Sequence, residues 1–211
     1  MSAKTSYTAQ FIPNKDRFEP SHRKEHCSAN LDEIDMIGLK LGQQVRIENP
    51  TANGKTLALY TIIDTHKEQP DVVYVGYSKP KDLCDRLELC DESSSTYTFT
   101  GNLNAQVTAV GLTVSQARCN SEFIEQLDDN GHHRGLIVIA PHGGDIEPYT
   151  DEQAEHIGKQ LSSKCVSVWV CKGFKEHGGA FDRWHITSTD ISEESFPKLR
   201  TVFGRQFEYT H

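Results

Sequence analysis

The sequence lacks any long apolar segment. Its start, MSAKTSYTAQFIPNKDRFEP, has no apolar core of a secretory signal, and no run approaches the length of a membrane-spanning helix. The mean hydropathy is −0.56 and only 36% of the 211 residues are hydrophobic. Nine Phe, seven Tyr and two Trp still allow a core. We therefore expect a cytoplasmic protein with no membrane partner, made of one large domain or two small ones.

Several common site signatures are also absent. The six cysteines include no CxxC pair, and the chain has no GxSxG nucleophile elbow, P-loop or dinucleotide fingerprint. Without a secretory signal or tight metal-ligand spacing, reduced thiols are expected, with a Cys84–Cys90 bridge as the alternative.

Positive charge is scarce, because 22 Lys and Arg stand against 30 Asp and Glu, which gives a net charge of −8. Proteins that bind nucleic acid rely on basic surface to neutralise phosphate, so nucleic acid is not an expected partner. A polyanionic substrate would need local positive charge from a metal ion and nearby arginines.

The most informative stretch is LIVIAPHGGDIEPYTDEQAEHIGKQL, residues 136–161. Leu136 to Ala140 is a short apolar and largely β-branched run, which predicts a buried strand that ends at Pro141. Thr150, with a glutamine three residues later, has the capping-box pattern that begins a helix.

The loop between this strand and this helix contains His142 and Glu147. Open α/β sheets place their sites in such strand-to-helix loops. Two glycines would let the loop fold back, so that the imidazole and the carboxylate converge on one ion. One His, one Glu and a further His would form a catalytic zinc shell with an open position. The alternative is a polar loop with a hydrogen-bonded histidine.

The APHGGxIEP motif, followed some forty residues later by HITST at 185–189, resembles the poly-γ-glutamate hydrolase family. That family consists of zinc peptidases with a carboxypeptidase-like α/β fold, and the resemblance covers roughly residues 136–200. It implies that His142 and Glu147 are zinc ligands. It also implies an anionic glutamyl polymer or peptide as substrate.

In the family, the chain continues past the HITST segment to a His-Gly strand that supplies the third ligand and to a late glutamate that acts as general base. This sequence ends at His211 and contains neither, so it is expected to be truncated at its C-terminus relative to the family. No catalytic residue is assigned.

Two residues near the second motif are further candidates. His185 could contact substrate or act as a substitute third ligand, and its alternative is a hydrogen-bonded histidine at a strand edge. Arg183 could bind a substrate carboxylate through two hydrogen bonds, and its alternative is a salt bridge to Asp182 or a neighbouring acid. His177, in a second His-Gly-Gly sequence, is expected to be a surface residue.

Two functional hypotheses follow. The first is a zinc-dependent hydrolase of γ-glutamyl amide bonds, in which zinc polarises the carbonyl and activates water. The second is a catalytically inactive homologue or fragment that acts as an interaction or regulatory protein. An uncovered sheet edge would then promote oligomerisation or bind a partner.

The composition and predicted secondary structure of the chain divide it into three segments. Residues 1–30 predict a flexible polar arm, residues 31–112 a β-rich accessory module, and residues 113–211 a partial zinc-peptidase-like α/β domain with a mixed sheet flanked by helices. The fold class expected overall is α+β.

Within these parts, alternating and apolar runs predict strands at 44–47, 56–63, 71–77 and 165–171, and a β-like run at 103–114. Residues 81–90 predict a short helix or a loop, and residues 183–189 a strand or an extended loop. Helices are predicted at 115–127 and 195–203.

Overall fold

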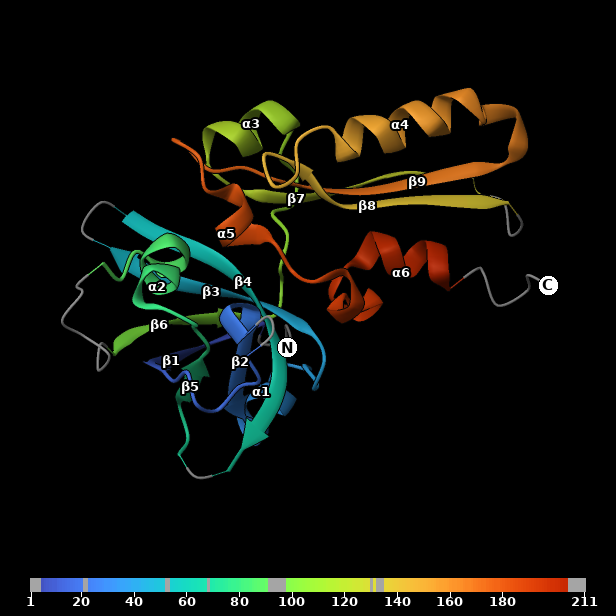
Figure 1. Cartoon of the computed structure of the whole chain (residues 1–211). Coiled ribbons are helices and arrows are strands. Elements are labelled where there is room, and N and C mark those ends of the chain that lie inside the picture. The colour runs from blue at the N-terminus through green and yellow to red at the C-terminus, as the bar shows by residue number, and fades with distance from the viewer. Residues whose placement is uncertain are drawn as a thin grey trace. The chain divides into compact units, whose positions relative to one another are not determined.

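The computed structural model describes residues 5–20, 23–51, 54–67, 69–90, 98–129, 131 and 135–204 (Figure 1). Two compact units make up the chain. The first contains residues 1–107 and 185–195, and the second contains residues 108–184 and 196–211. The first unit is built on a closed barrel and the second on a separate sheet, so the fold class is α+β. Among the described residues, no helix combines the length and apolar character needed to cross a membrane.

Six strands form the barrel: β1 Ser6–Pro13, β2 His26–Asn30, β3 Gln44–Thr51, β4 Gly54–His66, β5 Val72–Val75 and β6 Phe99–Asn104. They close in the order β1-β5-β2-β4-β3-β6. β1 pairs in parallel with β5 and β2 with β4, whereas the other neighbours are antiparallel. The barrel unit also contains α1 (Leu31–Met36), α2 (Pro80–Leu87) and a 3-10 helix, η1 (Arg23–Glu25).

Apolar alternation along the strands builds the barrel core. On β3, Val45 and Ile47 are fully buried, as the sequence pattern predicts. On β1, Tyr7, Ala9 and Phe11 are buried while the residues between them are exposed. The segment 1–30 was expected to be a flexible arm, but its described residues contribute β1 and β2 to the barrel.

The segment 185–195 belongs to the barrel unit and not to the α/β part, where it was expected. It forms two 3-10 helices, η3 (Ser188–Asp190) and η4 (Glu193–Ser195), and not a strand. Gln44 binds both of them: its backbone N–H donates to Ser195 Oγ at 2.8 Å, and its side-chain amide donates to Asp190 O at 2.6 Å.

The second unit contains a mixed sheet of three described strands, β7 (Phe123–Asp128), β8 (Leu136–Gly144) and β9 (Val166–Gly173), in the order β7-β9-β8. β8 is parallel to β9 and β7 is antiparallel to it. Every residue of β9 is buried, as predicted for a strand that is covered on both faces. Its helices are α3 (Val114–Cys119), α4 (Thr150–Gln160), α5 (Ala180–Trp184) and α6 (Pro197–Phe203), with the 3-10 helix η2 (Ser162–Lys164) after α4.

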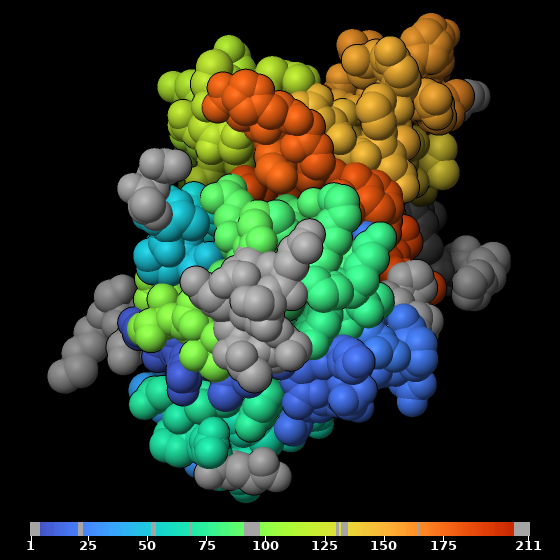
Figure 2. Space-filling view, turned by 60° about the vertical axis from the view of Figure 1, so that its left-hand side comes forward, coloured from blue at the N-terminus to red at the C-terminus, as the bar shows by residue number. Residues whose placement is uncertain are grey.

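α4 and α6 lie on opposite faces of this sheet (Figure 1). On the α4 face, Val168 and Val170 of β9 pack with Ala154. On the α6 face, the ring of Trp169 contacts that of Phe196 edge-on, with 5.5 Å between centroids. The outer side of α4 is exposed and forms the golden surface in Figure 2.

Two predictions for the start of this unit are wrong. The helix predicted over 115–127 ends at Cys119, and residues 123–128 form strand β7. The spacing of the apolar residues Phe123, Ile124 and Leu127 fits the periodicity of a helix as well as that of a strand. These residues form a strand because they pair antiparallel with β9. The prediction of β structure over residues 103–114 is also wrong beyond Asn104, where β6 ends.

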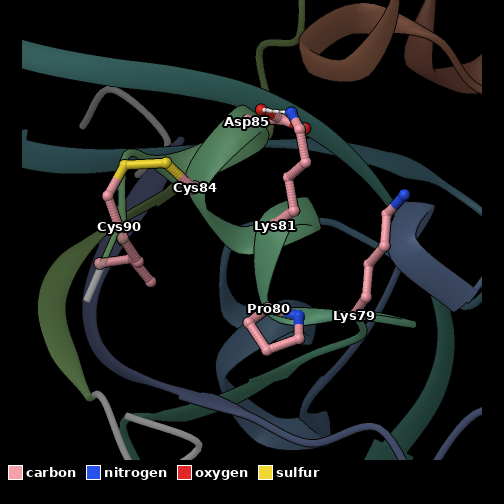
Figure 3. Close-up of a pocket in the computed structure, with 7 residues that line it drawn as sticks. Lys79, Pro80, Lys81, Cys84, Asp85 and Cys90 are labelled. Carbon is pink, nitrogen blue, oxygen red and sulfur yellow. Dashed lines mark hydrogen bonds and ion pairs between the residues drawn. A yellow bond between two sulfur atoms is a disulfide. The ribbon is translucent and has the colours of Figure 1, made fainter. Parts of the chain in front are cut away.

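Cys84 and Cys90 form a disulfide, which confirms the alternative to the expected reduced thiols for this pair. The bridge joins α2 to the residues that follow it and lines a cavity of about 560 Å³ in the barrel unit (Figure 3). Lys81 lies at the same cavity, where its ammonium group contacts Asp85 at 2.6 Å. This cavity contains none of the predicted site residues.

Candidate metal centre

The predicted metal loop continues directly from strand β8. The strand does not end at Pro141 but runs on to Gly144, with a register shift between Ala140 and Gly143. A side chain at Gly143 would place its Cβ 2.5 Å from the Cβ of Asp151, which is closer than real Cβ atoms approach. Gly144 has a φ of +70°, which favours glycine. The two glycines are therefore required for the path that the loop takes.

His142 and Glu147 lie together, as expected from a loop that folds back. His142 Nδ1 is 3.4 Å from Glu147 Oε2, and the Glu147 backbone N–H donates to His142 O at 2.8 Å. The His142 side chain is 9% exposed and that of Glu147 is 43% exposed. An imidazole nitrogen and a carboxylate oxygen at this separation can contact one ion, and both are donors that zinc accepts. The pair thus fits two positions of a zinc shell.

The start of α4 holds Glu147 in a way that the sequence did not predict. The expected capping box of Thr150 is wrong, because the residue before the helix is Tyr149, with a φ of 78°. Instead, Thr150 Oγ1 donates to Glu147 O at 3.0 Å. This hydrogen bond ties the backbone of the candidate ligand to the first turn of α4.

An ion-pair network between α4 and β9 contacts the backbone of the loop. Asp151 Oδ1 accepts from the Gly144 backbone N–H at 3.2 Å, and Asp151 Oδ2 is 2.9 Å from Lys172 Nζ. Lys172 also contacts Glu155 at 2.6 Å. Burial alone would raise the pKa of Asp151, but the hydrogen bond and charge of Lys172 lower it below its ordinary value. The network joins β9 and α4 to the loop, and no motif in the sequence predicts it.

In the barrel unit, His185 is hydrogen-bonded to a buried glutamate. His185 Nδ1 is 2.8 Å from Glu25 Oε1, and Thr187 donates to Glu25 Oε2 through its backbone N–H at 2.8 Å and its hydroxyl at 3.1 Å. Burial would raise the pKa of Glu25, but the hydrogen bond with His185, the positive charge of Arg86 and the hydrogen bond from the Thr187 backbone lower it to about 2. Glu25 is therefore a carboxylate near neutral pH.

The residues before His185 are buried. Trp184 ends α5 and donates its indole N–H to Phe174 O at 2.7 Å. Arg183 lies on the same helix and is also buried. These two residues form helix and not strand, although the sequence predicted an extended segment. His177 is a surface residue, as expected, with a side chain 90% exposed.

A comparison with known protein families supports the resemblance to poly-γ-glutamate hydrolases that the two motifs indicate. Residues 114–202 match the family model described as poly-gamma-glutamate hydrolase. The matched segment includes the loop with His142 and Glu147 and the HITST segment. No curated protein matches the chain.

Proposed function

We propose that this chain is a zinc-dependent hydrolase of γ-glutamyl amide bonds of the poly-γ-glutamate type, with a carboxypeptidase-like arrangement in its second unit. The contact between His142 and Glu147 carries the proposal, because it lies inside the segment that is similar to poly-gamma-glutamate hydrolases. Zinc in hydrolases commonly takes three protein ligands of these types and keeps one position open.

His185 is the third ligand in this proposal. Its contact with Glu25 supports the assignment, because metal-ligating histidines almost always donate their other ring N–H to a carboxylate, a carbonyl or water. If His185 is not a ligand, its role is to contact substrate. Arg183 is assigned to a substrate carboxylate, which a guanidinium binds through two parallel hydrogen bonds.

When bound, zinc would polarise the scissile carbonyl and lower the pKa of a water molecule. His142 and Glu147 would hold the ion. The half-exposed carboxylate of Glu147 leaves the site accessible from solvent. Because the chain has a net charge of −8, the positive charge needed for an anionic polymer must be local. The ion and Arg183 would supply it.

The test is hydrolysis of poly-γ-glutamate by the purified chain with added zinc, followed by size-exclusion chromatography of the polymer. We expect His142→Ala and Glu147→Ala each to lower the rate at least about 100-fold, because each removes a zinc ligand. His177→Ala is the matched control, since it alters a histidine of an exposed His-Gly-Gly sequence and should leave the rate unchanged. Equal rates in His142→Ala and the wild type would contradict the proposal.

One observation favours a second function, that of an interaction protein without activity. Among the described strands, β8 pairs only with β9, and it contains the apolar residues Leu136 and Ile139, which are 47% and 44% exposed. An apolar strand edge of this kind promotes association with another chain. The second function predicts an oligomer that Ile139→Lys dissociates, as measured by light scattering. A monomer that cleaves poly-γ-glutamate would exclude it.

A further inference from the structure

Glu25 is a charged residue in an unexpected place. It lies at the end of η1 with a side chain only 2% exposed, and its carboxylate accepts hydrogen bonds from Thr187 and contacts His185. All three residues belong to the barrel unit. A buried carboxylate is costly to desolvate, so the hydrogen bonds that it accepts must compensate for its burial.

The three hydrogen bonds fix the orientation of this carboxylate. The backbone N–H and the hydroxyl of Thr187 both donate to Oε2, which leaves Oε1 for the imidazole. An ionised carboxylate has no proton to donate. His185 Nδ1 must therefore carry the hydrogen of this contact, and in the neutral ring Nε2 is then the nitrogen with the lone pair.

We propose that Glu25 is a positioning residue that holds His185 in the Nδ1–H tautomer and so presents Nε2 as its ligand atom. The inference deepens the proposed function and rests on it for the role of His185 toward zinc. The positioning group lies 160 residues before the histidine in the sequence and in the same unit.

The near-isosteric variant Glu25→Gln makes a sharp test. Its amide oxygen should take the place of Oε2, where Thr187 offers two donors, so that the NH2 group faces His185 Nδ1. Nδ1 must then accept a hydrogen bond, and the ring proton moves to Nε2. A protonated Nε2 cannot bind a metal ion.

The first measurement needs no metal. Long-range ¹H–¹⁵N correlation spectra of the zinc-free protein, at a pH where the ring is neutral, report which nitrogen of His185 is protonated. We expect the Nδ1–H tautomer in the wild type and the Nε2–H tautomer in Glu25→Gln. The Nδ1–H tautomer in both proteins, or the Nε2–H tautomer in the wild type, would overturn the inference.

The second measurement is zinc affinity by competition with a chromophoric chelator. Glu25→Gln should weaken zinc binding about 10- to 100-fold. The matched control is Glu125→Gln, which changes a buried carboxylate with three hydrogen-bond donors in the other unit. It should leave the His185 tautomer and zinc affinity unchanged, and an equal loss of affinity in both variants would overturn the inference. If the wild type binds no zinc, the proposed function fails, while the tautomer experiment still decides the role of Glu25.

Discussion

Replacing Lys172 with methionine tests the network behind the metal loop. Lys172 lies on β9, and its ammonium group contacts Asp151 at 2.9 Å and Glu155 at 2.6 Å, both on α4. The side chains of Lys172 and Asp151 are each 9% exposed. Methionine keeps an unbranched side chain of similar length but removes the cation. Asp151, which also accepts from the Gly144 backbone, then remains buried without its ionic partner.

The magnitude follows from burial. Removing one partner of a buried ion pair costs about 3–5 kcal/mol, because the remaining charge is uncompensated. Glu155 is 38% exposed and regains water, so its lost contact adds less than about 1 kcal/mol. Because Asp151 and Lys172 are not fully excluded from solvent, we expect Lys172→Met to lower the free energy of unfolding by about 2–4 kcal/mol at neutral pH.

The pH dependence has a definite sign. The folded pKa of Asp151 is lowered, so its contribution to stability is present above the unfolded carboxyl pKa of about 3.9 and is lost as pH falls through the folded value. The folded pKa of Lys172 is raised, so its contribution is present below its unfolded pKa and is lost only as pH rises through the folded value. The difference between wild type and variant should therefore be largest near neutral pH and shrink in acid.

Urea unfolding followed by tryptophan fluorescence measures this difference, because both tryptophans, Trp169 and Trp184, lie in the second unit. Lys159→Met, at an exposed position of α4, is the control and should change stability by less than about 0.5 kcal/mol. The double variant Asp151→Asn/Lys172→Met should be more stable than Lys172→Met alone. A loss below about 0.5 kcal/mol in Lys172→Met, or a loss that grows in acid, would refute this reasoning.

Three further predictions concern other contacts. Glu125→Ala should cost about 3–5 kcal/mol in urea unfolding, because it leaves two buried donors and one half-buried donor without their acceptor, and a cost under about 1 kcal/mol would refute this. Reducing the Cys84–Cys90 disulfide should lower the stability of the barrel unit by about 2 kcal/mol from loop entropy, measured by far-UV circular dichroism with the double serine variant as comparison. Gly143→Ala should weaken zinc binding more than about 10-fold, since its Cβ would clash with Asp151 and displace the loop, and unchanged affinity would contradict this.

Elements with a clear local pattern could be predicted from the sequence. The strands β3 and β9 and the helix α4 show alternation, an apolar run or helical spacing within one segment. The residues of β7 could not be assigned in this way, because their apolar spacing fits a helix as well as a strand. Long-range pairing with β9 decides that case. Residues 1–30 were likewise assigned to an arm, since the burial of β1 and β2 depends on pairing with strands far along the chain.

The same distinction applies to the candidate site. His142 and Glu147 were found because a short glycine loop brings them together and a motif marks it. Glu25 was missed, since it carries no motif and its contact with His185 spans 160 residues. Lys172 was missed for a similar reason: it looks like a surface lysine until β9 and α4 are placed against each other. Groups that orient a site through long-range contacts leave little local trace in the sequence.

The most direct test of the zinc proposal is the metal content of the purified chain beside His142→Ala and the exposed control His177→Ala. The account predicts about one zinc ion per chain in the wild type and in His177→Ala, and almost none in His142→Ala. A wild-type chain without zinc, or equal zinc in all three proteins, would contradict it.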